Sequence, residues 1–456
     1  MERTEPRASW ENAAEGDVNS SPARSTWTAE LSEPALQLLK EDERYFFRQS
    51  LSTPCLDVIV QAHGATLVDV EGREILDFHG NSVHQVGYGH PRVVEAVKAQ
   101  LDQLPFSPRR YTNATAIMLA RRLAGLAPGD LNKVLFAPSG AAAVGMALKL
   151  ARYATGRHKT ISMWGAFHGA NLDTVSIGGE AIFRRGAGPL LPGTEHVPPP
   201  GLAERFFGKD GRAHERLAEY IDYVLEVEGD VAAVIAEPVR WTTVDVPPAD
   251  FWPRVRVSCD RHNCLLIFDE VPSCLGRTGS MFACEQFGAV PDILVVGKGL
   301  GGGVMPMAAI VAGAHLDVVP EGAIGHYTHE KSPLGAAAAM ATLDVIEEEG
   351  LLSRARALGT ATLDRLKAVA LSFAGVLGAV RGLGMYWGLE VRPAGPRSGA
   401  EVADALLYAC LRRGLSFKVG GNDIVTLCPP LNISTEELDR ALDILATAAA
   451  EVSSRP

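Results

Sequence analysis

Leu265-Leu266-Ile267-Phe268-Asp269-Glu270-Val271 is an apolar run that leads into two acids, and Asp292-Ile293-Leu294-Val295-Val296-Gly297-Lys298-Gly299 is a second apolar run that leads to a lysine between glycines. Continuous apolar runs of this length are typical of parallel strands that are covered on both faces. Ligands bind at the carboxyl ends of the strands in such sheets. The two runs therefore predict that Asp269 and Lys298 reach one crevice.

An acid and a lysine in one crevice are the pair that a pyridoxal phosphate (PLP) enzyme requires. The lysine forms a Schiff base with the cofactor, and the carboxylate keeps the pyridine nitrogen protonated. The glycines after Lys298 allow a ligand to approach the backbone closely. The alternatives are a surface lysine at the end of a strand and an acid that pairs with an arginine such as Arg277. We interpret Lys298 and Asp269 as catalytic residues that also bind PLP.

Composition limits the class of protein. The chain has 456 residues, 47% of them hydrophobic and 21% charged, which is ordinary for a globular enzyme with a large and a smaller domain. The formal net charge of -11 argues against a nucleic-acid binder. The seven cysteines lack metal-site spacing, so we expect no metal and reduced thiols in a cytoplasmic protein. No apolar run approaches the ~18 residues that a membrane span needs.

The pattern of apolar residues predicts the fold class. Strands and helices alternate from residue 133 onward, which favours an α/β protein with a mainly parallel sheet flanked by helices. The expected strands of this sheet are 134–137, 159–163, 231–236, 265–269, 293–296 and 308–312. Helices are expected at 34–51, 91–104, 114–126 and 334–349, a hairpin at 66–78 and a loop at 192–211.

The C-terminal part mixes expected helices (401–413, 435–452) with short strands (379–381, 385–390, 424–427), which predicts a smaller α+β domain. The expected division has four parts. Residues 1–30 are a polar, poorly ordered tail, 31–80 an N-terminal segment that packs with the small domain, 81–333 the large PLP-binding domain, and 334–456 a linking helix and the small domain.

The turn after the expected strand 134–137 is a candidate phosphate site. Ser139, Gly140 and Ala141 begin a helix, where free backbone N–H groups and the helix dipole favour an anion. Many turns between a strand and a helix share this composition, so the interpretation depends on the acid and the lysine. Thr328, in a polar loop, is a second candidate donor to the phosphate.

Two further strand ends carry candidate cofactor residues. Phe167 could stack on a pyridine ring, and His168 follows it; the alternative is a core phenylalanine beside a hydrogen-bonded loop histidine. Glu237 could bond the hydroxyl region of the cofactor or pair with an arginine.

Candidate substrate residues are cations and one tyrosine in loops. Arginine suits the bidentate recognition of carboxylate or phosphorus oxyanions. The alternative is that these charged residues in loops are simply solvated. The candidates are Arg109, Arg110, Tyr111, Arg240, His329 and Lys331.

These residues together resemble the class III (omega) aminotransferase family, a group of PLP enzymes of fold type I, from about residue 56 to the C-terminal helix. The most specific part is Phe268-Asp269-Glu270-Val271, Gly276-Arg277-Thr278-Gly279 and Gly297-Lys298-Gly299. The resemblance implies that Lys298 carries the cofactor, that Phe167 stacks on it, and that the protein is a homodimer with active sites at the interface. It also implies that Thr328 reaches the phosphate of the neighbouring subunit's cofactor.

The sequence departs from the usual family pattern. Ala141-Ala142-Ala143 replaces the hydroxyl residue and acid that follow the glycine of the phosphate turn, and Pro272-Ser273-Cys274 follows the acids. The segments 79–84, 108–113 and 326–331 are similar to a branch that acts as an ammonia-lyase on 1-hydroxy-2-aminoethylphosphonate. The alternatives are an omega-aminotransferase that uses a keto acid, a phospho-lyase for amino-alcohol phosphates, and a non-catalytic binding module.

Overall fold

The computed structural model describes residues 21–49 and 52–454. The first described element is helix α1 (Pro22–Glu30), which corrects the expectation of a poorly ordered tail for residues 22–30; residues 1–20 lie outside the described part. The Ser21 hydroxyl caps this helix, and the indole of Trp27 is 2% exposed and donates to the Leu56 carbonyl at 2.9 Å. One buried aromatic residue thus anchors a helix that is otherwise polar.

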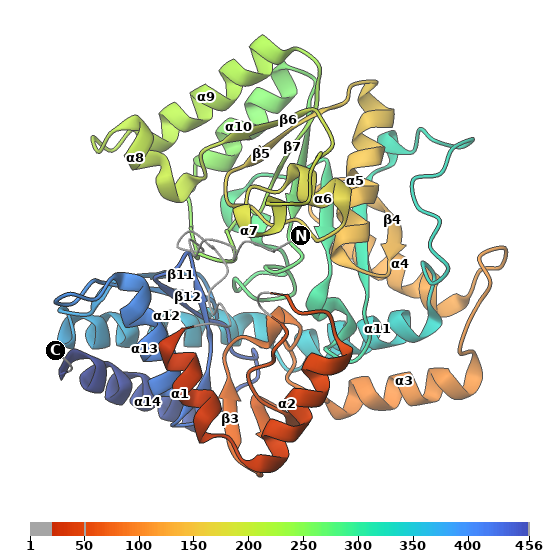
Figure 1. Ribbon diagram of the computed structural model, residues 1–456. Coiled ribbons are helices and arrows are strands. Elements are labelled where there is room, and N and C mark those ends of the chain that lie inside the picture. The colour runs from red at the N-terminus through yellow and green to blue at the C-terminus, as the bar shows by residue number, and fades with distance from the viewer. Residues whose placement is uncertain (1–20, 50–51, 455–456) are drawn as a thin grey trace, which may run out of the picture.

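The main sheet has seven strands in the order β4-β10-β9-β8-β7-β5-β6 (Figure 1). Strand β10 is antiparallel to both of its neighbours and the other strands run parallel, which confirms the prediction of a mainly parallel sheet. The strands are β4 (Leu131–Ala137), β5 (Lys159–Met163), β6 (Thr194–Val197), β7 (Val231–Ala236), β8 (Leu265–Asp269), β9 (Ile293–Val296) and β10 (Ala308–Gly313).

Within the main sheet, β6 is the strand that the sequence did not predict, because residues 192–211 were expected to form a loop. It is short, it pairs only with β5, and three of its four residues are only partly buried. An edge strand of this kind lacks the continuous apolar run that marks the inner strands.

Alternating side chains divide the core into two layers, one on each face of the main sheet. Leu266, Phe268 and Leu294 belong to one buried cluster, whereas Ile267 and Ile293 belong to the other. Helix α5 (Gly140–Thr155) packs on one face against β7, β9 and β10, and α10 (Phe251–Arg261) contacts β8. The period of two along each strand therefore explains why helices cover both faces.

The remaining helices of this part surround the sheet (Figure 1). They are α3 (Pro91–Gln103), α4 (Ala114–Leu126), α6 (Leu172–Ile177), α7 (Ala181–Arg184), α8 (Ala203–Phe207), α9 (Ala213–Glu228) and α11 (Pro333–Glu348).

Helix α2 (Glu33–Tyr45) ends earlier than the expected residue 51, because the chain turns extended at Phe46 and forms an isolated bridge between Gln49 and Thr53.

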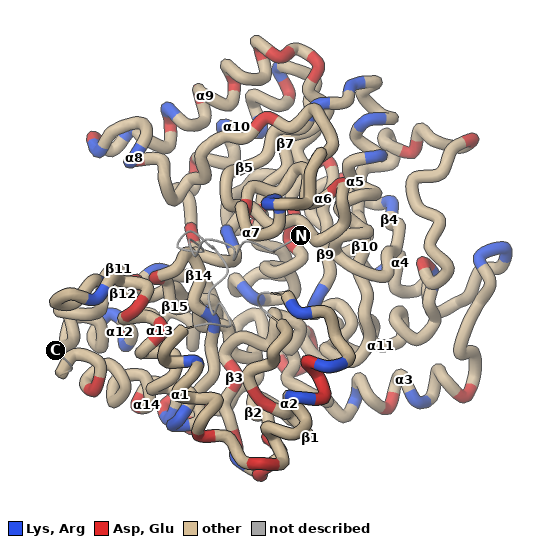
Figure 2. The backbone as a smooth tube through the Cα atoms, viewed as in Figure 1, with Lys and Arg blue, Asp and Glu red and all other residues tan. Residues whose placement is uncertain are grey.

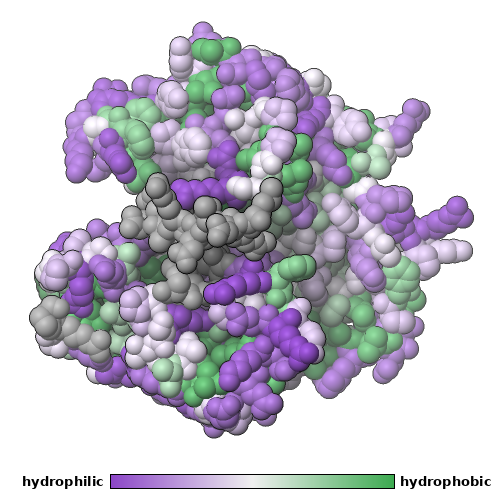
Figure 3. All heavy atoms as spheres, viewed as in Figure 1, coloured by the Kyte–Doolittle hydropathy of each residue, from purple (hydrophilic) through white to green (hydrophobic). Residues whose placement is uncertain are grey.

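The C-terminal part has its own sheet, in the order β11-β12-β15-β14. Its elements are α12 (Leu351–Ser372), β11 (Leu377–Gly382), β12 (Trp387–Val391), α13 (Gly399–Leu411), β14 (Lys418–Gly420), β15 (Ile424–Leu427) and α14 (Thr435–Ser454). In the space-filling view a notch separates this part from the region of α8 and α9 (Figure 3).

A third sheet joins the two ends of the chain. Its N-terminal strands are β1 (Ile59–His63), β2 (Thr66–Asp69) and β3 (Glu74–Asp77), and its fourth strand is β13 (Leu415–Ser416), which lies parallel to β3. The residues that follow β3 and β13 are therefore brought to the same side of the molecule. Within the described residues no helix is both long and apolar enough to cross a membrane.

Candidate active site

The carboxyl end of β8 delivers a buried acid. Asp269 is 3% exposed and accepts from the Val271 N–H at 3.1 Å. Its other oxygen lies 2.8 Å from Nδ1 of His168. An ionised carboxylate can only accept, so Nδ1 of His168 carries the proton of this hydrogen bond. Nε2 is buried and has no hydrogen-bond partner among the described residues.

The carboxyl end of β9 delivers the lysine. Lys298 follows Gly297 directly and has φ 46°, a left-handed conformation that is uncommon for a residue with a side chain. Its Nζ lies 5.2 Å from the centre of the Trp241 ring. Burial lowers the pKa of Lys298, while the carboxylates of Glu237 and Asp269 act in the opposite direction. The fraction of neutral amine near pH 7 is thus larger than for a solvated lysine.

These side chains border one cavity of about 410 Å³. The predicted residues that line it are Gly140, Ala141, Phe167, His168, Glu237, Asp269 and Lys298. The ring of Phe167 packs against that of Phe183 with centroids 4.4 Å apart. The ends of five strands of the main sheet, β4, β5, β7, β8 and β9, therefore meet at one place, as the sequence predicted for Asp269 and Lys298.

The turn that was predicted to bind a phosphate begins a helix. Gly140 is the first residue of α5, and a Cβ there would lie 3.0 Å from a Val271 methyl group. The Ser139 hydroxyl accepts from the Ala142 N–H at 3.2 Å, which caps the helix, and Ser139 does not line the cavity.

Glu237 ends β7 and borders the cavity. It accepts from the backbone N–H of Trp241 at 2.8 Å. Burial raises the pKa of Glu237; the charge of His168 lowers it, and that of Asp269 raises it further. A second acid beside Asp269 increases the negative potential near Lys298.

Arg240 does not line the cavity. Its guanidinium donates to the Thr242 hydroxyl at 3.2 Å and to the backbone carbonyls of Trp164 and Gly165, and it lies 4.0 Å from Glu180. Backbone oxygens therefore occupy the donors that the sequence analysis assigned to a substrate.

The other predicted substrate residues lie in two loops that meet at the edge of the molecule, away from the cavity (Figure 1). Arg109 Nη1 lies 2.5 Å from Nδ1 of His326, and Asn113 donates to the Lys331 carbonyl at 3.1 Å. Figure 2 shows the basic tip of the loop between α3 and α4. Arg109, Arg110, Tyr111, Thr328 and His329 are exposed and Lys331 is partly buried.

The cavity is also lined by residues that were not among the predicted site residues, although segment 79–84, Val271 and Pro272 were quoted as parts of motifs. They are His79, Asn81, Gly169, Ala170, Phe183, Trp241, Thr242, Val271, Pro272 and Lys418. Burial lowers the pKa of Lys418 to about 7. Lys418 begins a three-residue strand of another sheet, so no pattern near it in the sequence indicates its position.

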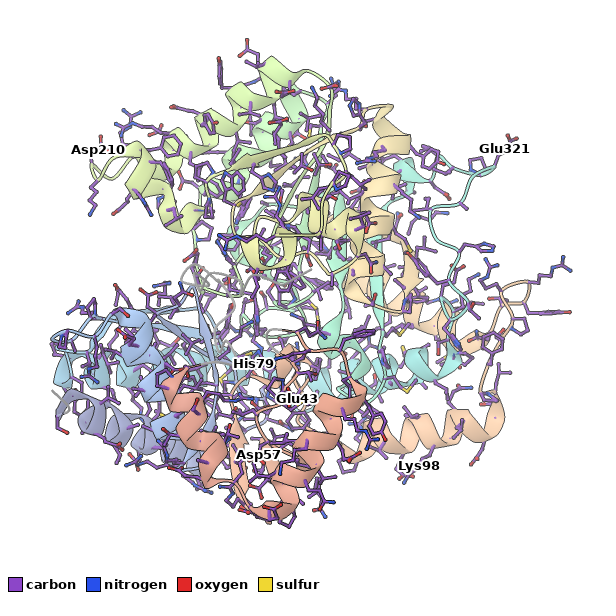
Figure 4. The ribbon with its side chains drawn as sticks, viewed as in Figure 1. Glu43, Asp57, His79, Lys98, Asp210 and Glu321 are labelled. Carbon is purple, nitrogen blue, oxygen red and sulfur yellow. The ribbon has the colours of Figure 1, made fainter. Side chains whose placement is uncertain are left out.

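His79 reaches the cavity through an unusual turn. The backbone N–H groups of His79 and Gly80 both donate to the Asp77 carboxylate, at 2.9 and 3.0 Å. Gly80, Asn81 and Ser82 all have positive φ values, between 45° and 58°. Three consecutive left-handed residues are energetically costly and cluster at functional sites. Figure 4 labels His79 at the centre of the molecule, where the N-terminal segment meets the main sheet.

The residues at this cavity fit PLP. The orphaned Nε2 of His168, the buried carboxylate of Asp269 and the amine of Lys298 lie at one cavity. The phosphate turn at Gly140 borders the same space. A ring with one basic nitrogen, one aldehyde and one phosphate matches this set of groups.

Comparisons with known proteins agree with this chemistry. The family profile described as aminotransferase class-III matches residues 48–449. A protein named (R)-1-hydroxy-2-aminoethylphosphonate ammonia-lyase from Vibrio splendidus is 45% identical, over 96% of this chain and 95% of its own. A putrescine aminotransferase from Pectobacterium atrosepticum is 36% identical, over 83% of this chain and 79% of its own.

Solved structures show the same fold. An (S)-enantioselective omega-transaminase from Thermomicrobium roseum has a TM-score of 0.85 and 29% identity, and covers 92% of this chain and 99% of its own. A PLP-bound amine transaminase from an uncultivated Pseudomonas species has a TM-score of 0.83 and 30% identity, with 90% and 99% coverage. The fold predicted from the sequence, a type I PLP enzyme, is confirmed. The chain belongs to the class III aminotransferase family, and it is an enzyme whose cofactor is pyridoxal 5'-phosphate.

Proposed function

We propose that the protein is an ammonia-lyase that converts 1-hydroxy-2-aminoethylphosphonate to phosphonoacetaldehyde and ammonia. One observation of the structure carries the proposal: two lysines, Lys298 and Lys418, line the same cavity. Lys298 is suited to hold the cofactor, and Lys418 is a cation for a substrate that has an anionic group as well as an amine. The ammonia-lyase that shares 45% identity with almost the whole chain acts on such a substrate.

The chain's own residues would hold the cofactor as follows. Asp269 would keep a proton on the pyridine nitrogen, and the hydrogen bond from His168 fixes the orientation of this carboxylate. Phe167 would pack on the ring. The N–H groups of Gly140 and Ala141, with the hydroxyl of Ser139, would bind the phosphate at the start of α5.

PLP, when bound, makes the carbon that carries the substrate amine acidic and accepts the electron pair left on it. The Nζ of Lys298 takes the proton from this carbon, which the lowered pKa of Lys298 favours because the amine must be neutral. The same proton is then available to the neighbouring hydroxyl, which leaves as water. Addition of water to the product releases the aldehyde and ammonia, so the overall reaction removes only NH₃.

The phosphonate needs cations. Lys418, on β14 of the C-terminal sheet, is the cation that lines the cavity together with Lys298. A phosphonate next to Lys418 favours the charged form of this lysine, because an anion stabilises the ammonium. Arg240 contacts the wall of the cavity through its hydrogen bond to the Thr242 hydroxyl.

We further propose a homodimer in which the two edge loops serve the partner's cavity. The supporting observation is that Arg109, Arg110 and Thr328 are exposed and lie together, yet none of them lines the cavity of its own chain. A mixture of Lys298→Ala and Arg110→Ala protomers tests this proposal. Reassociated hybrid dimers are expected to regain activity at one site, whereas activity that never exceeds that of the separate variants would contradict shared sites.

We also place the protein in the cytoplasm. All seven cysteines are unpaired and six of them are buried, which suits a reducing compartment.

The deciding experiment is an ammonia assay. Purified, PLP-loaded protein is mixed with 1-hydroxy-2-aminoethylphosphonate in the absence of any keto acid. Steady release of many equivalents of ammonia is expected. A single equivalent of product, with turnover restored only by pyruvate or 2-oxoglutarate, would instead identify an omega-aminotransferase. Release of inorganic phosphate from an amino-alcohol phosphate would identify a phospho-lyase. If no amine reacts at all, the protein is a binding module.

A further inference from the structure

Trp241 is the aromatic wall of the cavity beside the reactive lysine. Its ring centre lies 5.2 Å from Nζ of Lys298, and the side chain is 6% exposed. An ammonium over an indole face is attracted by the π electrons of the ring. The wall therefore contacts the group that any substrate amine must replace.

The small domain holds this indole in place from behind. The ring of Tyr386 stacks on Trp241 with centroids 4.7 Å apart and an angle of 15° between the planes. The Tyr386 hydroxyl, fully buried, donates to the carbonyl of Arg240 at 3.0 Å and also to that of Trp241. The stacked ring of Tyr386 and its hydrogen bonds to the backbone of Arg240 and Trp241 leave the indole little freedom to move away.

The backbone of this segment is fixed as firmly as the ring. The Trp241 N–H donates to Glu237, and the Thr426 hydroxyl donates to the Thr242 carbonyl at 3.2 Å. Gly420 lies so close to that carbonyl that a Cβ there would clash with it. Both domains thus clamp residues 241 and 242, and enlarging the cavity on this side would require the domains to separate.

We propose that Trp241 determines which amines the site accepts: it binds the arriving ammonium through its ring and excludes amines with a bulky group on the carbon next to nitrogen. The inference rests on the proposed function only in that a primary amine reacts at Lys298. The nitrogen of a substrate must reach the position of Lys298 Nζ. The groups attached to the carbon next to this nitrogen therefore have to fit between that position and the indole. An unbranched two-carbon chain satisfies this limit, and a benzyl group does not.

The test measures amine binding rather than turnover. PLP-loaded wild-type protein, Trp241→Ala, Trp241→Phe and the control Tyr223→Ala are titrated with ethylamine and with benzylamine, and the absorbance of the bound cofactor is followed. Tyr223 is an exposed aromatic residue on α9, outside the cavity lining, so its loss should change nothing. The ratio of the two dissociation constants is the result.

In Trp241→Ala the preference for ethylamine over benzylamine is expected to fall at least roughly tenfold, because the removed bulk admits the benzyl ring. Loss of the indole should weaken the binding of both ammonium ions alike. Trp241→Phe should lie between the alanine variant and the wild type, and it serves alone if the alanine variant does not fold. An unchanged ratio in a variant that still shows bound-cofactor absorbance would overturn the proposal. So would a wild-type absorbance that responds to neither amine.

The proposed function can fail separately. A wild type that releases no ammonia from 1-hydroxy-2-aminoethylphosphonate, while the amine preference still shifts in Trp241→Ala, would reject the lyase and keep the specificity wall. Normal ammonia release with an unchanged amine preference would keep the lyase and reject Trp241 as the specificity wall.

Discussion

Lys298 and Lys418 line the same cavity, but they reach it in different ways. Lys298 ends an inner strand of the main sheet, and the apolar run before it predicts both its burial and its direction. Lys418 begins a three-residue strand in another sheet, and only the packing of the two domains brings it to the cavity. In our proposal the large domain (residues 81–333) thus supplies the reacting lysine, whereas the small domain (residues 334–456) supplies a group that selects the substrate.

The largest expected effect is at the large-domain lysine. Lys298→Ala removes both the attachment of the cofactor and the base, and kcat for ammonia release is expected to fall by a factor on the order of 10³ or more. Lys98→Ala, an exposed lysine on α3, is the control and should retain normal activity. If Lys298→Ala keeps more than a tenth of the wild-type rate, the assignment of the two lysines is reversed or wrong.

The next effect is at the acid. Asp269→Asn preserves the shape but loses the charge that would keep the ring nitrogen protonated, and its single amide oxygen cannot accept from both His168 and the Val271 N–H. We expect kcat to fall about 10²-fold or more, because this interaction matters most when negative charge develops on the cofactor. Steady-state kinetics with cofactor in excess separates this loss from weaker PLP binding. If only the affinity for PLP changes and kcat does not, Asp269 binds the cofactor but has no role in the reaction.

The small-domain lysine is expected to affect binding more than chemistry. Lys418→Met should raise KM for the aminophosphonate roughly 10- to 100-fold and change kcat far less, because a charge-assisted contact is lost in the ground state and the transition state alike. The dissociation constant for ethylamine, which has no anionic group, provides the control and should stay the same. Equal losses for both ligands would show that the variant disturbs the cavity as a whole.

The pH dependence of kcat/KM further distinguishes Lys418 from Lys298. Because burial lowers the pKa of Lys418 to about 7, its ammonium form is lost as the pH rises through this value in the free enzyme. We expect kcat/KM for the phosphonate to decline above about pH 7, by up to tenfold per pH unit. Lys418→Arg keeps its charge throughout this range and should remove this part of the decline. An identical profile in both proteins would assign the decline to another group.

The smallest effect is expected at the phosphate turn. Ser139→Ala removes the helix cap observed in the structure, which should lower the free energy of unfolding by about 1 kcal/mol. Cofactor affinity should fall by less than about tenfold, since the backbone N–H groups remain. Chemical denaturation of the cofactor-free protein and PLP titration measure the two effects. A larger loss of PLP affinity would make the hydroxyl a principal phosphate ligand.

Local sequence was sufficient wherever a functional residue follows its strand directly. Asp269, Lys298, Glu237 and the turn at Gly140 all belong to this group, because a buried strand fixes the place of the next residue. Trp241 and Lys418 were missed because their places depend on contacts between domains, such as the stacking of Tyr386 on Trp241. Arg240 was assigned to substrate on charge alone, and backbone carbonyls compete for its donors.

The pairing of β13 with β3 determines when the site can form during synthesis of the protein. His79 follows β3, whereas Lys418 follows β13 more than three hundred residues later in the chain. The third sheet cannot close, and the cavity cannot receive both residues, until β13 and Lys418 have been synthesised. Contacts between such distant parts of a chain form slowly. A nascent chain therefore carries its main sheet before it carries a working site, and a prematurely terminated one lacks Lys418 and the strand that places it.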